Sequence, residues 1–140
     1  MRTNQSVRAL AFDQDGNLVL IKRTRPGRQT YWVAPGGGVE SEDSDLDSAL
    51  RRELFEELHA EVEIGREVLV FRTGEIVTHI FLVRIGRMSA DLRTGPEFAD
   101  MSRGMYEVEC IEPFSGNLRS LNIQPEEVRA FVAEHVAGPA

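Results

Sequence analysis

The segment Ser44-Asp-Leu-Asp-Ser-Ala-Leu-Arg-Arg-Glu-Leu-Phe-Glu-Glu-Leu58 carries the most informative pattern in the chain. Its leucines recur every four residues, at Leu46, Leu50, Leu54 and Leu58. This spacing predicts an amphipathic helix from about Ser44 to Leu58, because residues four apart lie on the same face of a helix. Ser44 and Asp47 resemble a capping pair at its start. The leucine stripe needs a neighbouring layer to pack against, so the flanking sequence decides the fold class.

Three glutamates of this segment, Glu53, Glu56 and Glu57, share one face of the predicted helix. At roughly 100° per residue they fall within an arc of about 100°. Like charges at this spacing repel one another, and partial burial beside the leucines adds a desolvation cost. Mg²⁺ or Mn²⁺ would compensate all three, since these cations prefer carboxylate oxygens. The alternative is an ordinary solvated acidic face.

Strand patterns surround this helix. Val7 to Phe12 and Leu18 to Lys22 form a predicted hairpin, because the Asp13-Gln-Asp-Gly-Asn17 turn joins them. Ile76 to Ile85 is apolar on both faces, which is typical of a strand inside a sheet that is covered on both sides. Further strands are expected at Tyr31 to Val33, Val62 to Arg72 and Met105 to Ile111.

Two other segments complete the predicted architecture. The glycine run Gly36 to Gly38 follows Pro35 and is poorly suited to any regular element, so we expect a loop there. A closing helix is expected from Pro125 to Val136, with the proline in its first turn. The order of elements favours an α/β fold, a sandwich with a mixed β-sheet between helices, in a single domain over residues 1–140.

Charge and composition limit the class of partner. The net charge of -7 makes strong nucleic-acid binding unexpected, and a phosphate-rich substrate would need local arginines or a metal cation. Cys110 is the only cysteine, so no intrachain disulfide can form. No signal peptide or membrane-spanning stretch is apparent in the sequence, and we expect a cytoplasmic protein with no membrane partner.

The segment Trp32-Val-Ala-Pro-Gly-Gly-Gly-Val-Glu40, followed by Arg52-Glu-Leu-Phe-Glu-Glu57, resembles the signature box of the Nudix hydrolase family. Aligning Gly37 with the first glycine of the box places Asp43 where the box has its first glutamate. Eight residues then separate Asp43 from Arg52, whereas the box has seven at this point. Aligning Gly38 restores the spacing but places Ser44 there, so we prefer the Gly37 alignment. His59 stands where the family has glycine, and we expect it to adopt a left-handed conformation.

The resemblance implies a Nudix-like α/β/α sandwich and divalent-metal-dependent hydrolysis of a diphosphate linkage. The substrate would be a nucleoside diphosphate derivative or a nucleoside triphosphate, with Mg²⁺ or Mn²⁺ as the cofactor. It implies that Glu53, Glu56 and Glu57 bind the metal, with the carbonyl of Gly37 as a further ligand, and that Arg52 orients the glutamates. A homodimer is compatible with the family. The rival hypotheses are a nucleotide sensor without turnover and a non-enzymatic domain whose acidic helix contacts a basic partner.

The remaining site residues are less constrained by the pattern. The candidate general bases are Glu107, Glu109, Glu97 and Asp100. The alternative for each of them is an ordinary acidic residue on the surface. The basic cluster Lys22, Arg23, Arg25 and Arg28 is a candidate phosphate contact or a solvated loop. Trp32 could stack on a base or belong to the core. His79 alternates with Val77 and Phe81, which favours a buried structural histidine over a catalytic one.

Overall fold

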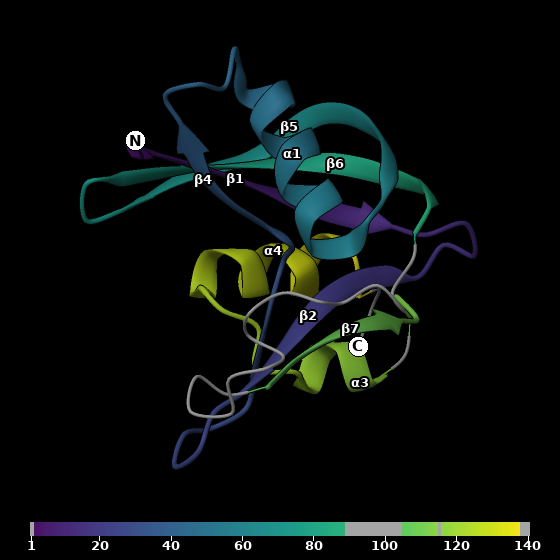
Figure 1. Cartoon of the computed structure of the whole chain (residues 1–140). Coiled ribbons are helices and arrows are strands. Elements are labelled where there is room, and N and C mark those ends of the chain that lie inside the picture. The colour runs from purple at the N-terminus through teal and green to yellow at the C-terminus, as the bar shows by residue number, and fades with distance from the viewer. Residues whose placement is uncertain (1, 89–104, 115, 138–140) are drawn as a thin grey trace.

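The computed structural model describes residues 2–88, 105–114 and 116–137, and Figure 1 shows their arrangement. Seven strands form one sheet in this part of the chain. The elements in chain order are β1 Arg2–Phe12, β2 Leu18–Thr24, β3 Tyr31–Val33, β4 Gly36–Glu40, α1 Leu46–Leu58, β5 Glu61–Thr73, β6 Ile76–Arg87, β7 Met105–Ile111, α3 Gly116–Ser120 and α4 Glu126–His135.

The sheet is mixed, as expected. Its main path is β3-β2-β1-β6-β5, with β4 added to β1 and β7 added to β2. β1 and β6 are parallel, whereas the other pairs are antiparallel. One edge of β1 is divided between two partners: Ala11 and Phe12 pair with β2, whereas the half from Arg2 to Arg8 pairs with β4. The strands β2, β3 and β7 therefore part from β1 along most of its length.

Helices cover both faces of the sheet, and Figure 1 shows α1 and α4 on opposite sides of it. The α1 leucines Leu50, Leu54 and Leu58 are fully buried with Val83 and Ile85 of β6 in one core cluster. Ile80 of β6 packs into a second cluster with α3 and α4 residues. The predicted α/β/α sandwich is thus confirmed, whereas the two-sided burial of β6 is confirmed only in part. On its second face Ile80 is buried, but Ile76 and Leu82 are 46% and 37% exposed. Leu82 lines a surface groove with Phe12 and Gly65.

The glycine run forms strand β4, so the expectation of a loop was wrong. Gly36 has a φ of +146°, and a Cβ there would lie only 2.1 Å from the carbonyl oxygen of Val7. The amide of Ala9 donates to the carbonyl of Pro35 over 2.8 Å. Glycine lets the backbone of β4 lie this close to β1, which is why a weak strand former occupies a strand here.

Both ends of α1 are capped. The N-cap is Asp45, not Ser44, and the Asp45 carboxylate accepts from the amide of Ser48 over 2.7 Å. The predicted pair of Ser44 and Asp47 was therefore wrong by one residue; the Ser44 hydroxyl instead contacts that of Ser48. At the other end, His59 has φ 48° and ψ 45°, and its amide donates to the carbonyl of Phe55. The left-handed conformation expected of His59 is confirmed.

The closing helix also differs slightly from expectation. Pro125 precedes α4 as its N-cap in an extended conformation, and the helix runs from Glu126 to His135. The short helix α3 has no counterpart among the predicted elements, because five residues are too few to show a helical period. Within the described ranges, no helix combines the length and apolar character that crossing a membrane requires.

Candidate active site

A cleft of about 810 Å³ opens where β2, β3 and β7 part from β1. Its lining brings together residues that are far apart in the chain. They include Glu53, Glu56 and Glu57 of α1, Gly36, Gly37 and Gly38 of β4, Arg8 of β1 and Arg23 of β2. The glutamate face of the helix and the glycine run therefore share one cleft, because β4 runs along β1 directly before the chain turns into α1.

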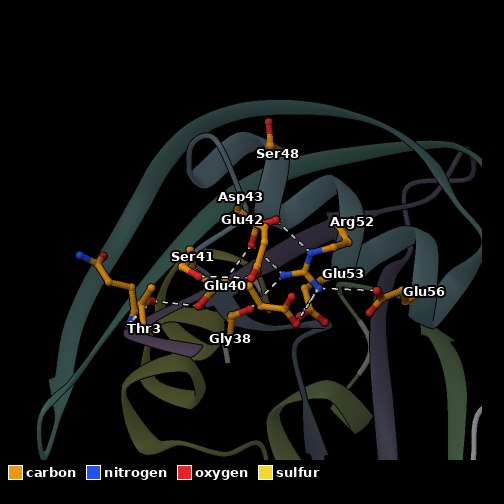
Figure 2. A network of polar contacts seen from close by, with 12 residues as sticks. Thr3, Gly38, Glu40, Ser41, Glu42, Asp43, Ser48, Arg52, Glu53 and Glu56 are labelled. Atoms are coloured by element: carbon orange, nitrogen blue, oxygen red, sulfur yellow. Dashed lines mark hydrogen bonds and ion pairs between the residues drawn. The ribbon is translucent and has the colours of Figure 1, made fainter. Parts of the chain in front are cut away.

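Arg52 is the hub of the polar network in Figure 2. Its guanidinium makes two hydrogen bonds to the Asp43 carboxylate, at 2.8 and 3.0 Å. It also donates to Glu53 over 3.1 Å and to the carbonyl of Gly38 over 3.1 Å. Its distances to the carboxylates of Glu56 and Glu40 are 3.6 and 3.8 Å. One side chain thus joins the β4–α1 loop to the glutamate face of the helix.

Asp43 is the partner that Arg52 holds most closely. The Asp43 side chain is only 8% exposed, and it also accepts from the amide of Glu40 over 2.8 Å. Its hydrogen bonds with Arg52, followed by the one from Glu40, lower the pKa of Asp43 to about 2. Since Asp43 contacts Arg52 whereas Ser44 contacts Ser48, the geometry favours the alignment of the box on Gly37.

Glu53 lies directly over Gly37. A Cβ on Gly37 would lie 2.6 to 2.7 Å from the carboxylate atoms of Glu53, so no side chain fits at residue 37 with Glu53 in this position. The Glu53 side chain is 12% exposed, whereas that of Glu56 is 57% exposed. The glutamates of this face therefore differ in exposure: the carboxylate of Glu53 packs against the backbone, whereas that of Glu56 is open to solvent.

The carboxyl of Glu57 lies in a strongly desolvating environment. Burial raises the pKa of its carboxyl to about 7, although the hydrogen bond from the amide of Gly36 and the charge of Arg8 act in the opposite direction. The Gly36 amide lies 2.7 Å from Glu57 Oε1. The partners of Glu57 thus compensate its charge incompletely, and a cation in the cleft would complete the compensation.

This set of side chains fits a hard divalent cation, because three carboxylates line one cleft and carboxylate oxygens are the ligands that such cations prefer. Over the described parts of the chain, no three acidic, histidine or cysteine side chains are already grouped as a metal cage. In this arrangement Arg52 holds Glu53 and Glu56, and the Gly36 amide holds Glu57. A cation would compete with these partners for the same oxygens.

The predicted basic cluster does not act as one unit. Arg23 lines the cleft with its guanidinium over the ring of Tyr106, and its Nε is buried without a hydrogen-bond partner among the described residues. Lys22 points to the other face of β2 and lies over Trp32. Arg25 and Arg28 are exposed in the β2–β3 loop and are not part of the cleft lining. Of the cluster, only Arg23 is placed to meet a ligand in the cleft.

The candidate bases on β7 are not placed in the cleft either. β7 contributes Tyr106 to the lining, and alternation along the strand directs Glu107 and Glu109 to the opposite face. Glu109 accepts a hydrogen bond from Trp32 Nε1 over 2.6 Å. Trp32 itself packs against the α4-side core, which favours the core interpretation over stacking on a base. Glu97 and Asp100 lie outside the described residues.

His79 is held by two side-chain contacts. Its ring nitrogens lie 2.7 Å from Glu67 and 2.6 Å from Gln5, and its side chain is 16% exposed. The ring is thus partly rather than fully buried, and His79 itself is not among the residues that line the cleft.

Arg8 is the site residue that the sequence analysis missed. It lines the cleft, and its Nη1 donates to the carbonyl of Ala34 over 2.6 Å. Burial lowers the pKa of its guanidinium, partly offset by the nearby charges of Glu57 and Glu53. A single arginine in a strand carries no motif, although Arg8 is the one charged residue within the predicted strand from Val7 to Phe12, and this was a signal.

Comparison with known proteins agrees with this geometry. Residues 2–126 match the NUDIX domain model. The chain is 29% identical over 128 residues to an RNA pyrophosphohydrolase of Caulobacter vibrioides strain NA1000, covering 91% of this chain and 67% of that protein. Solved structures with the same fold include the ORF135 protein of E. coli, with a TM-score of 0.63, 23% identity and coverage of 97% of this chain and 93% of that one.

The MutT protein from Methanosarcina mazei Go1 has a TM-score of 0.64 at 21% identity, over 93% of this chain and 90% of that one. The chain therefore belongs to the Nudix family. It is a Nudix hydrolase, an enzyme of the class that cleaves pyrophosphate linkages in nucleotide derivatives.

Proposed function

We propose that this enzyme uses Mg²⁺ or Mn²⁺ to hydrolyse the diphosphate linkage of a nucleoside diphosphate derivative or a nucleoside triphosphate. The observation that carries the proposal is the placement of Glu53, Glu56 and Glu57 in one cleft with the backbone of Gly36 to Gly38. Family membership favours this enzyme over a sensor that binds a nucleotide without turnover and over a non-enzymatic acidic helix.

In this proposal, Glu53, Glu56 and Glu57 hold the cation, with the carbonyl of Gly37 as a further ligand. When bound, such a cation activates water and neutralises charge on phosphoryl oxygens. Arg52 orients Glu53 and Glu56 through its contacts at 3.1 and 3.6 Å. The hydrogen bond from the Gly36 amide fixes the rotamer of Glu57. These contacts determine where the carboxylate oxygens stand before a substrate arrives.

Arg23 is the proposed phosphate contact of the protein itself. A buried donor without an acceptor costs about 1–3 kcal/mol, and a phosphate oxygen in the cleft would satisfy it. Its stacking on Tyr106 restrains the guanidinium, so little side-chain entropy remains to be lost on binding. The proposal gives this contact to Arg23 and not to Arg25 or Arg28, because both of these lie outside the cleft lining.

The general base is proposed to come from the acids that reach the cleft. Among the described lining residues these are Glu40, Glu53, Glu56 and Glu57. Glu97 and Asp100 stay candidates from the sequence alone. Glu107 and Glu109 are not among the lining residues, which supports the four acids of the cleft instead.

A substrate panel tests the proposal directly. Nucleoside triphosphates, nucleotide sugars, ADP-ribose and dinucleoside polyphosphates would be incubated with Mg²⁺ or Mn²⁺, and the phosphate-containing products would be resolved by chromatography. We expect metal-dependent cleavage of at least one compound. Glu56→Gln and Glu57→Gln should each reduce kcat by about a hundredfold or more while the protein still folds.

The matched control is Glu61→Gln, which changes an exposed glutamate at the start of β5, outside the cleft. Its kcat should stay near that of the unmodified protein. The proposed function would be contradicted if no compound of the panel were cleaved with either ion, or if Glu57→Gln kept full activity.

A further inference from the structure

Arg8 sits at the centre of the sheet, in register with Gly36 of β4 on one side and Ile80 of β6 on the other. On the same face, Leu10 and Ile80 belong to the core, whereas Ser6 and Thr78 line the cleft. An arginine at such a position is costly unless its charge and donors have partners. The partners that Arg8 has therefore indicate why a charged residue occupies this position.

The first partner of Arg8 is the corner that leads into β4. Arg8 Nη1 donates to the carbonyl of Ala34 over 2.6 Å, and the next carbonyl, that of Pro35, accepts from the amide of Ala9 over 2.8 Å. Two consecutive carbonyls of the corner are thus held by β1. The next residue is Gly36, which has a positive φ of +146°. Its amide donates to the Glu57 carboxylate.

The corner in turn holds Glu57, because the Gly36 amide donates to Glu57 Oε1 over 2.7 Å. Arg8 and Glu57 line the same cleft. Arg8 thus acts on Glu57 through the Ala34–Pro35–Gly36 corner, whose amide binds the carboxylate.

We propose that Arg8 is a positioning residue for Glu57, which it serves by anchoring the Ala34–Pro35–Gly36 corner from strand β1. The inference rests on the proposed function in so far as Glu57 takes part in catalysis. It makes a different claim, however, because it assigns to Arg8 a structural action that is measurable without substrate or metal.

The test compares Arg8→Gln, Arg8→Lys and the control Arg51→Gln. Arg51 lies on α1 but pairs with Asp47 on the exposed side of the helix, away from the cleft. In the metal-free protein, amide hydrogen exchange of Gly36 should accelerate about tenfold in Arg8→Gln relative to amides of β6. Arg8→Lys keeps a charged donor and should retain most of the protection, and Arg51→Gln should leave it unchanged.

Steady-state kinetics on the best substrate of the panel give the second measurement. A residue that acts through Glu57 should alter kcat rather than KM, so Arg8→Gln should lower kcat about tenfold or more with KM nearly constant. Arg8→Lys should recover kcat to within about threefold. Should Arg8→Gln fail to fold, Arg8→Met conserves the apolar part of the side chain and takes its place.

Two results would overturn the proposal. An increased KM at constant kcat, with Gly36 exchange unaltered, would make Arg8 a direct substrate contact. Unaltered exchange together with unaltered kinetics would leave it without a role at the site. If the unmodified protein cleaves no compound of the panel, the proposed function fails, and the Gly36 exchange rates still decide the role of Arg8.

Discussion

Gly36 and Gly37 are neighbours in β4, but an added side chain would meet different groups at the two positions. At Gly36 it would meet the backbone of Val7 and Arg8, at 2.1 and 2.6 Å, which cannot move without disrupting the sheet. At Gly37 its three nearest neighbours would all be carboxylate atoms of Glu53, the end of a side chain that can rotate away. The first glycine therefore serves the fold, and the second serves the position of one carboxylate.

This contrast predicts that Gly37→Ala separates stability from activity. Displacement of Glu53 should lower kcat by roughly a hundredfold, because misplacing a catalytic group by about 1 Å costs that much. Thermal unfolding should change little by comparison. Gly86→Ala is the control, since a Cβ there would lie 3.6 Å from its nearest neighbour, the carbonyl of Glu61. Equal activities of the two variants would refute this role of Gly37.

Asp43 provides a pH-dependent contribution to stability. Its pKa is lowered from 3.8 to about 2 in the folded protein, so the folded state favours the ionised carboxylate. The contribution is fully present above about pH 4 and is lost as the pH falls towards 2. Asp43→Asn should therefore unfold at a lower temperature at pH 7, and the difference from the unmodified protein should shrink below pH 4. A difference that is constant between pH 7 and pH 2 would exclude this linkage.

At the scale of the elements, period and turn chemistry predicted most strands and both long helices. The leucines of α1 and the apolar residues of β6 were sufficient to predict a helix and a strand, because their spacing indicates which positions are buried. β4 was missed because its glycines do not by themselves predict a strand. Glycine is needed there so that the backbone can lie close to β1, and this contact exists only in the assembled sheet. The N-cap was misplaced because Ser44, Asp45 and Asp47 are all plausible caps, and the structure alone shows which carboxylate reaches the Ser48 amide.

The identity of the cap predicts unequal effects of two neighbouring substitutions. Asp45→Ala removes the acceptor for the amide of Ser48 and should lower Tm by about 4 °C. Ser44→Ala removes only a contact between two exposed hydroxyls and should leave Tm nearly unchanged. Differential scanning calorimetry of both variants is the measurement, and an equal decrease in Tm would assign the cap to both residues.

At the scale of the whole molecule, the sequence predicted the acidic half of the site better than the basic half. The three glutamates occupy one helix, so a local period was enough to group them. Arg8 and Arg23 come from different strands and meet in the cleft only because β2 parts from β1. Arg25 and Arg28 are neighbours of Arg23 in the chain, but both are exposed and lie outside the cleft lining.

The net charge predicts a preference for small substrates. With 23 acidic and 16 basic residues, the surface as a whole repels a polyanion, although one relative carries the name RNA pyrophosphohydrolase. Extending a nucleoside triphosphate to a 5′-triphosphorylated oligonucleotide should therefore not lower KM. The comparison requires one fixed concentration of salt and of Mg²⁺. A KM that falls at least tenfold with oligonucleotide length, and rises steeply with salt, would indicate a dedicated RNA-binding surface.

The parallel pairing of β1 with β6 also has a consequence for the order of events during folding. Val7 pairs with His79, so the two strands are 72 residues apart in the chain. Contacts of such long range carry a large loop-closure entropy and form slowly, whereas the β5–β6 hairpin and α1 are local. We therefore expect the hairpin and the helix to form early and β1 to insert between β6 and β4 afterwards. The carboxylates of α1 would then exist on a formed helix before any cleft surrounds them.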